Sequence, residues 1–286
     1  MYGGLRHERA VPHVGTYRRE LPVSLERLYE NAVDWEHLPC LHRSSFARIE
    51  CADAGAWGFQ ARVWPQPYDE RRSIVIELRL DRELRRWITS TLDGPGTGTE
   101  VWTHAFSLAE RRTLVVVDFF VPGIDKTQAI EVGRFYSSLY ARLYDEDVSM
   151  MSERQVQLDA ARAPVAENGP PTVLGSLAEV RARLPIMIDD GARKFCIVES
   201  GEELVAYSAV CPHLLGPLGQ VKVRDGVVEC PWHGYRYDIR TRRCLSGANL
   251  SLPPAPQVRI DRDSRVIVDF IELSSDMPRQ RGTYRK

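Results

Sequence analysis

Two short tracts in the last third of the chain each pair one cysteine with one histidine. Cys211 and His213 form a Cys-x-His tract, Cys230 and His233 form a Cys-x-x-His tract, and sixteen residues separate the two. Two thiolates and two imidazoles suit a 2Fe–2S centre in which two histidines hold one of the irons. A zinc ion could use similar ligands. Both tracts begin with Cys-Pro, which favours the iron–sulfur interpretation.

A second set of possible ligands lies near the start of the chain. Asp34 and His37 stand three apart in a helix predicted over Leu21–Trp35, where they share a face and can hydrogen-bond. His42 follows His37 by five residues, about 140° round an ideal helix, so a regular helix would keep the two imidazoles apart. Pro39 lies between them and predicts that the helix kinks or ends there, which frees His42 to approach His37.

A carboxylate that could join the two histidines lies in a long helix predicted at about Lys126 to Ala160. The apolar face of this helix is marked by Phe135, Leu139, Leu143 and Met150. Asp147 comes four residues after Leu143 and therefore points inward with it, whereas Asp145 should face water. A carboxylate on a buried face is costly unless it is paired or bound to metal. With the two histidines it would make the facial triad of non-haem Fe(II) centres, which leaves positions open for O₂. The alternative is an irregular face on which both acids are solvated.

The elements around these residues indicate an α+β first domain over residues 1–160. Ser24 is a plausible N-cap for the opening helix. Apolar and polar residues alternate from Ser45 to Gly123, which is typical of strands. A helix, a curved antiparallel sheet and a long closing helix follow one another in a helix-grip (START/SRPBCC-like) fold, which encloses an apolar cavity. Six aromatic residues either line this cavity or belong to plain core: Trp57, Phe59, Trp64, Trp102, Phe106 and Phe119.

A linker rich in Pro, Gly and Ala is predicted at residues 161–172. Beyond it, short apolar runs bounded by turn residues predict a small all-β domain at residues 173–273, with both Cys/His tracts in loops at strand ends. The polar, basic tail at residues 274–286 is expected to be disordered.

Composition excludes several classes of function. The charges nearly cancel at a formal net charge of −1, so we expect neither nucleic acid nor an anionic membrane as a partner. There is no apolar run of about 18 residues and no apolar stretch in the first twenty, which favours a cytoplasmic protein without a spanning helix or secretory signal. Four further cysteines show no paired spacing and are expected to be free thiols: Cys40, Cys51, Cys196 and Cys244.

Both sets of residues resemble those of one known family. The tracts Cys211–Leu218 and Cys230–Tyr235 are similar to the two ligand loops of Rieske proteins. The tract Glu30-Asn31-x-x-Asp34-x-x-His37-x4-His42 and the run Glu146–Gln155 resemble the iron-binding segments of Rieske non-haem iron oxygenases, the family of ring-hydroxylating oxygenase alpha subunits.

The resemblance implies a role for each residue. A Rieske-type 2Fe–2S cluster would be held by Cys211, His213, Cys230 and His233, and a mononuclear Fe(II) by His37, His42 and Asp147. Asp34 would be the catalytic bridging carboxylate between His233 and His37, and Asn31 belongs to the same catalytic motif. The family also implies a head-to-tail homotrimer, in which the cluster of one chain serves the iron of its neighbour.

Three features depart from the family pattern. The Rieske domain follows the catalytic domain instead of preceding it, and the catalytic part, residues 1–160, is short. Leu214-Leu215 replaces the Arg-Gly that oxygenases usually show after the first ligand histidine. This loop is closer to that of a Rieske ferredoxin. The extra cysteine pair of respiratory Rieske proteins is missing, since Gly216 and Trp232 occupy those places, and we expect a reduction potential in the lower part of the Rieske range, roughly −150 mV.

Two functions follow from these residues. The first is a Rieske mono- or dioxygenase that hydroxylates or oxidatively demethylates an apolar aromatic or alicyclic small molecule with O₂, using electrons from a separate reductase or ferredoxin. The alternative is a Rieske ferredoxin-like electron-transfer protein fused to a non-catalytic helix-grip ligand-binding domain. The presence of every member of both metal sites favours the oxygenase.

Overall fold

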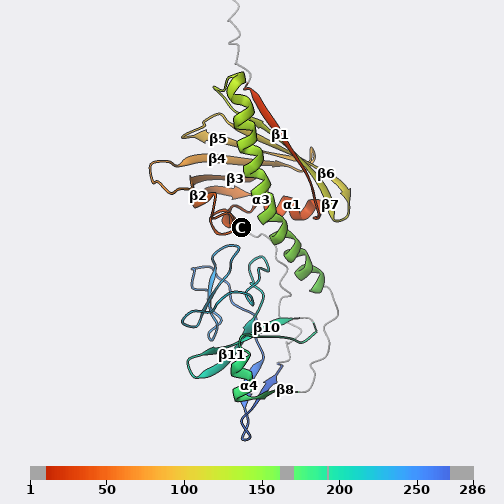
Figure 1. Ribbon diagram of the computed structural model, residues 1–286, viewed down its shortest axis with the longest axis vertical. Helices are drawn as coiled ribbons and strands as arrows, with labels where there is room; N and C mark the ends of the chain where they lie inside the picture. Colours follow the sequence, from red (N-terminus) through yellow and green to blue (C-terminus); the bar gives the residue numbers. More distant parts are fainter. Residues whose placement is uncertain (1–10, 162–170, 192, 271–286) are drawn as a thin grey trace, which may run out of the picture. The chain divides into compact units, whose positions relative to one another are not determined.

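The computed structural model describes residues 11–161, 171–191 and 193–270. The chain divides into two units, Met1–Ser152 and Glu153–Lys286. Figure 1 shows a sheet crossed by one long helix in the first unit and short strands with long loops in the second. The tail predicted at residues 274–286 and most of the predicted linker lie outside the described residues.

A seven-stranded antiparallel sheet forms the body of the first unit, in the order β1-β7-β6-β5-β4-β3-β2. The strands are β1 (His13–Leu21), β2 (Phe46–Gly55), β3 (Gly58–Pro65), β4 (Ile74–Asp81), β5 (Arg86–Asp93), β6 (Glu100–Ala109) and β7 (Arg112–Phe120). The predicted alternation is confirmed in β7, where Val115, Val117 and Phe119 are fully buried and their neighbours are less so. Strand β1 is missing from the sequence prediction, which placed Leu21 in the opening helix.

The helices beside the sheet are α1 (Leu25–Val33), the short 3₁₀ helix η1 (Trp35–His37), α2 (Leu38–Leu41) and α3 (Lys126–Ala160). The side chain of Ser24 caps α1 by accepting a hydrogen bond from the backbone N–H of Arg27 at 3.3 Å, as predicted. The position predicted for the break at Pro39 is wrong, because α1 already ends at Val33, with Asp34 as its C-cap. Pro39 lies instead in the first turn of α2, where its missing N–H has no intrahelical partner to lose.

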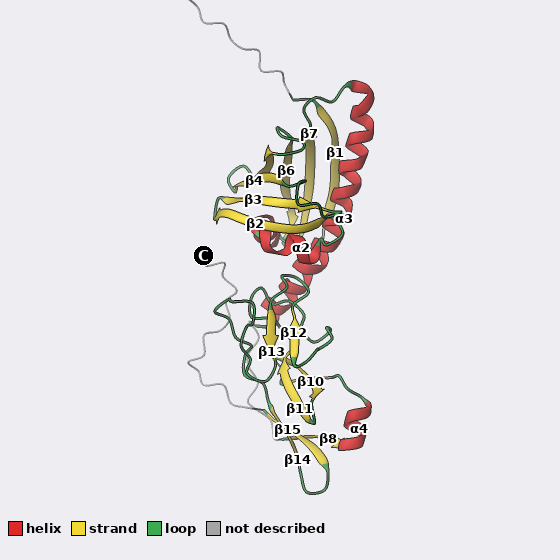
Figure 2. Ribbon diagram, turned by 90° about the vertical axis from the view of Figure 1, so that its left-hand side faces the viewer, coloured by secondary structure: helices red, strands yellow, loops and turns green. Residues whose placement is uncertain are grey.

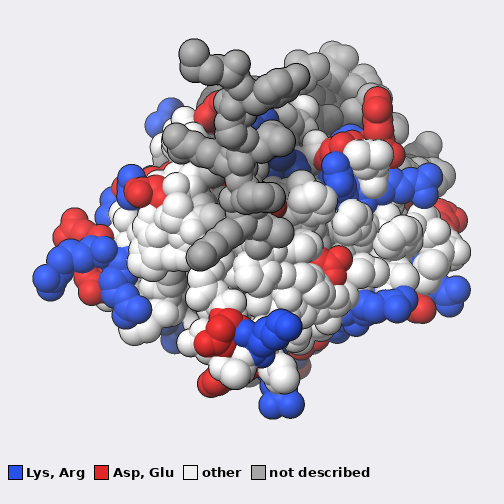
Figure 3. Space-filling model, turned by 90° about the horizontal axis from the view of Figure 1, so that it is seen from above, with Lys and Arg blue, Asp and Glu red and all other residues white. Residues whose placement is uncertain are grey.

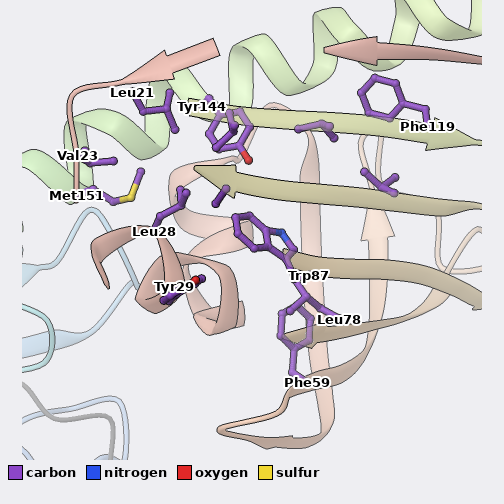
Figure 4. Packing of buried hydrophobic residues seen from close by; sticks show 14 of the residues in the cluster. Leu21, Val23, Leu28, Tyr29, Phe59, Leu78, Trp87, Phe119, Tyr144 and Met151 are labelled. Atoms are coloured by element: carbon purple, nitrogen blue, oxygen red, sulfur yellow. The ribbon is translucent and has the colours of Figure 1, made fainter. Parts of the chain in front are cut away.

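The long helix α3 has the predicted bounds, but its inner face is rotated from the predicted one. Phe135 is 63% exposed, whereas Tyr144 and Met151 are buried. The inner face includes Tyr136, Tyr140 and Tyr144, which pack against the core of the sheet and were not counted in the predicted apolar face. Figure 2 shows α3 running along one face of the sheet, and Figure 4 shows Tyr144 and Met151 among the core residues of the strands and α1.

Glycine allows the close approach of α3 to the edge strand β1. A Cβ atom at Gly133 would lie 2.2 Å from the carbonyl oxygen of Val14, and one at Gly15 would lie 3.2 Å from the Cα of Gly133. A side chain at Gly133 would therefore push the helix away from the sheet.

The second unit is a small all-β domain, as predicted, and it also contains the short helix α4, which was not predicted. Its elements are β8 (Thr172–Ser176), α4 (Leu177–Ala182), β9 (Ile186–Asp189), β10 (Lys194–Ser200), β11 (Glu203–Ser208), β12 (Val227–Glu229), β13 (Arg236–Asp238), β14 (Gln257–Ile260) and β15 (Arg265–Asp269). They form the sheets β11-β10-β9, β12-β13 and β14-β15-β8. The sequence prediction lacked β8, α4 and β14.

The surface carries both signs of charge. Figure 3 shows acidic and basic side chains interspersed over one face, in keeping with the net charge of −1. Of the helices within the described ranges, none combines the length and the apolar character that crossing a bilayer would require.

Candidate metal centres

Three predicted ligands of the first unit lie together. His37 ends η1, His42 caps the C-terminus of α2, and Asp147 projects from α3. One ligand atom from each lies within 4.8 Å of the others, and all three residues are buried, with at most 6% of their surface exposed. The turn from α1 into η1 and α2 is what brings the two histidines to one side, with their ring centres 5.0 Å apart.

Both imidazoles are oriented in the same way. Nε2 of His42 lies 3.0 Å from Oδ1 of Asp147, and Nε2 of His37 lies 3.5 Å from the same oxygen. On the other side of each ring, Nδ1 of His42 contacts Glu146 Oε2 at 2.6 Å, and Nδ1 of His37 lies 3.5 Å from Asp34 Oδ2. Since a carboxylate only accepts hydrogen bonds, the one beside each Nδ1 favours a proton there. A metal ion between Nε2 and Asp147 would then take the place of the proton that Asp147 favours on Nε2. Metal-binding histidines commonly have such a carboxylate partner.

The charges around the site favour a cation. Burial alone would lower the pKa of His42, but Asp147 and Glu146 raise it above its ordinary value. The pKa of Tyr144 is raised by burial first, and the negative charge of Asp147 adds to the effect. Three carboxylates around two imidazoles, with two Nε2 atoms and one carboxylate oxygen converging, fit a divalent metal ion such as Fe(II).

The remaining residues of the predicted motif lie beside this group. Asp34 is 2% exposed, and its position at the end of α1 puts its carboxylate next to His37. Asn31 lies in the last turn of α1, where its carbonyl accepts a hydrogen bond from the N–H of Asp34 at 3.2 Å. Its side-chain Oδ1 is buried and has no hydrogen-bond partner among the described residues. Asp145 is exposed and pairs with Arg19 at 2.6 Å, as its predicted orientation requires. Glu146 was not among the predicted site residues.

The two Cys/His tracts of the second unit form loops with the same backbone turn. The N–H of Cys211 donates to the carbonyl of Gly216, and the N–H of Cys230 to that of Tyr235, both at 2.8 Å. Each cysteine carbonyl accepts from the residue four positions later, Leu215 or Gly234, and both of these residues have φ of 68°. The loops are therefore two copies of one geometry.

The four predicted cluster ligands face one another. The rings of His213 and His233 are perpendicular with centres 4.5 Å apart, and both residues are half-buried. Cys211 and Cys230 are buried, and the Cys230 thiol leaves no room for a side chain at Gly216, where a Cβ would lie 2.8 Å from Sγ of Cys230. Buried sulfurs and more exposed imidazoles fit a 2Fe–2S cluster whose histidine-bound iron lies nearer the solvent.

The surroundings of Cys211 favour the ionised form of its thiol. Burial opposes ionisation, but hydrogen bonds from the Cys230 thiol and the Tyr237 hydroxyl lower the pKa of the Cys211 thiol to about 7. The same contact with Cys211, together with burial, raises the pKa of Cys230. The hydroxyl oxygen of Tyr237, in β13, lies 3.3 Å from Sγ of Cys211. Sequence reasoning missed Tyr237, although it stands only four residues after His233.

The aromatic candidates for a substrate cavity have different positions. Phe59 and Phe119 belong to the core, and Trp64 is buried with its indole N–H donating to the carbonyl of Glu70 at 3.1 Å. Phe106 is 48% exposed, so its assignment to a pocket is wrong; on β6 the residues that point inward are the odd-numbered ones. Trp57 lines a cavity of about 430 Å³ together with three arginines from β4, β5 and the turn between them: Arg79, Arg82 and Arg86.

Comparison with known proteins matches the second unit. Residues 171–256 match the family described as the Rieske [2Fe-2S] domain. The anthranilate 1,2-dioxygenase ferredoxin subunit of Burkholderia cepacia is 33% identical over 87 residues, which cover 30% of this chain and 76% of the relative.

Solved structures resemble each part of the chain. The Zhui aromatase/cyclase from Streptomyces sp. R1128 is 14% identical with a TM-score of 0.40, covering 50% of this chain and 95% of that one. The ferredoxin of carbazole 1,9a-dioxygenase from Nocardioides aromaticivorans IC177 is 23% identical with a TM-score of 0.32, covering 36% of this chain and all of that one.

Proposed function

This chain belongs to the Rieske [2Fe-2S] family through residues 171–256, and from this we propose that it works as a Rieske non-haem iron oxygenase. The proposed reaction is hydroxylation or oxidative demethylation of an apolar aromatic or alicyclic small molecule. The proposed partners are O₂, a separate reductase or ferredoxin, and two further copies of the chain in a homotrimer.

One observation carries this proposal. His37, His42 and Asp147 are buried with their ligand atoms within 4.8 Å of one another, and a carboxylate lies on the far side of each imidazole. An electron-transfer protein with a non-catalytic ligand-binding domain needs no such group. Buried carboxylates are costly unless something compensates their charge, and an Fe(II) ion would do so.

The residues have separate proposed roles. When bound, the cluster supplies single electrons and Fe(II) supplies the activation of O₂ for attack on the substrate. Asp34 and Glu146 hold the protons of Nδ1 and fix the orientation of the two imidazoles. In the homotrimer, Asp34 would also accept a hydrogen bond from His233 of a neighbouring chain.

The surroundings of the triad support an apolar substrate. Tyr140 and Tyr144 stand on the same helix as Asp147, and burial raises the pKa of both phenols, so they remain neutral. The buried Oδ1 of Asn31 supports its proposed catalytic role, because it is an acceptor that a substrate hydroxyl or a water could use.

A ferredoxin-like electron-transfer protein is the second candidate. The observation that favours it is that the curated relative is a ferredoxin subunit whose similarity covers 30% of this chain. In this case the helix-grip unit would bind a ligand without catalysing its oxidation.

The iron and acid-labile sulfide content of anaerobically purified protein distinguishes the two. About three irons and two sulfides per chain are expected for the oxygenase. About two of each, unchanged after incubation with Fe(II), would contradict it. Asp147→Ala should lose the third iron, and Asp145→Ala is the matched control. Asp34→Asn should then keep both metals and nearly abolish turnover; an unimpaired rate would exclude the bridging role.

A further inference from the structure

Arg154 is a buried arginine next to the first ligand loop of the second unit. It is 5% exposed, and its Nη1 donates a hydrogen bond to the carbonyl oxygen of Leu214 at 3.1 Å. Arginine is rarely buried to this extent unless its guanidinium is paired with another group. The residue belongs to the last turns of α3, which from Glu153 onward are part of the second unit.

The carbonyl that Arg154 contacts lies at a loop position that corresponds to a candidate ligand in the other loop. Since the two ligand loops have the same turn, Leu214 in the first loop occupies the position of His233 in the second, three residues after the cysteine. The neighbouring carbonyls of Cys211 and Gly216 already accept backbone hydrogen bonds within the loop. The carbonyl of Leu214 is held by Arg154 instead, immediately after the ligand His213.

We propose that Arg154 is a positioning residue of the 2Fe–2S cluster, which fixes the first ligand loop at Leu214 and raises the reduction potential through its buried positive charge. Reduction adds one negative charge to the cluster. A cation in surroundings of low dielectric constant stabilises this added charge more than it stabilises the oxidised cluster. The hydrogen bond also fixes the backbone on one side of His213, and with it the direction of the imidazole.

The test is a redox titration of the cluster in the full chain. Wild type, Arg154→Met and Arg154→Lys are compared with Arg134→Met, which makes the same change at an exposed arginine of α3. Iron and sulfide are measured first, so that only molecules with a cluster are compared. The potential is then followed by visible circular dichroism, and the reduced cluster by EPR.

Arg154→Met is expected to make reduction at least about tenfold less favourable, which is 59 mV for a one-electron couple. Arg154→Lys keeps the charge without the planar guanidinium, so its potential should stay close to that of wild type while the EPR g values change. Arg134→Met should match wild type in both measurements.

Three outcomes would overturn the proposal. The first is a potential of Arg154→Met equal to that of Arg134→Met. The second is an equal shift in Arg154→Lys and Arg154→Met, which would refute the role of the charge. If Arg154→Met binds no cluster, Arg154→Lys decides: g values identical to those of wild type would refute the positioning role. None of these measurements depends on oxygenase activity, because each reports on the cluster itself. Absence of a cluster in the wild type would be seen beforehand in its iron and sulfide content.

Discussion

Removal of the Glu146 carboxylate should weaken binding of the proposed Fe(II) ion by His37, His42 and Asp147. Glu146 Oε2 lies 2.6 Å from Nδ1 of His42, within the range of a charge-assisted hydrogen bond. Loss of such a partner typically costs 10- to 100-fold in metal affinity, or about 1.4–2.7 kcal/mol. We expect Glu146→Ala to fall in this range. Glu146→Gln retains an oxygen acceptor and should lie near the lower end.

The geometry also predicts an order of effects. Asp34 is 3.5 Å from Nδ1 of His37, at the outer limit of a hydrogen bond, so its contribution to metal affinity should be smaller than that of Glu146. Asp34→Ala should therefore weaken metal binding less than Glu146→Ala does. The side chain of Glu146 is 31% exposed, which screens part of its charge and makes the full 100-fold effect an upper bound.

The affinity can be measured anaerobically by titrating Fe(II) into protein without the mononuclear ion, in competition with a coloured chelator. Asp145→Ala is the matched control, because Asp145 is the adjacent acid but is 66% exposed and pairs with Arg19. Equal dissociation constants for Glu146→Ala and Asp145→Ala would refute the reasoning. So would an effect of Asp34→Ala larger than that of Glu146→Ala.

Three further variants test other parts of the structure. His37→Ala should remove about one iron per chain and keep both sulfides and the EPR signal of the reduced cluster; unchanged iron would mean that the site is misassigned. Tyr237→Phe removes a hydrogen bond to Cys211 and should lower the reduction potential by about 40 mV, the equivalent of about 1 kcal/mol, in a redox titration. Gly133→Ala should destabilise the chain by about 1–3 kcal/mol in urea unfolding, whereas the exposed Ser138→Ala should have little effect; equal stabilities would contradict the close approach of α3 and β1.

The two groups of candidate ligands could be recognised in the sequence because residue type and spacing mark them, and the structure brings the members of each group together. The two Cys/His tracts can be recognised by their residue types and spacing alone, and the inward direction of Asp147 follows from helical periodicity. The prediction of the other residues on this face was less accurate. Phe135 is exposed, and Tyr144 and Met151 share the inner side with Asp147. The predicted inward direction of Asp147 is confirmed, because the true inner face of the helix is shifted by only one residue from the predicted one and still includes Asp147.

The partners of the ligands could not be predicted from spacing. Glu146 precedes Asp147 and projects about 100° away from it on the helix, yet its longer side chain reaches His42. Tyr237 and Cys211 are 26 residues apart, and no periodicity relates a strand residue to a loop thiol. Strand β1 was missed because its exposed positions carry arginine and glutamate, while its pairing with β7 depends on residues about a hundred positions away.

The order of strands in the first sheet has a consequence for synthesis on the ribosome. Leu21 pairs with Thr113, so β1 emerges early and waits for β7, about 5–18 s at usual rates of elongation. Helix α3 comes next and supplies Asp147 well before Cys211 is added. The first unit can therefore complete its sheet and bring His37, His42 and Asp147 together before Cys211 and Cys230 are synthesised. We expect the nascent chain to acquire its structure in that sequence, with the iron–sulfur cluster as the last component to be inserted.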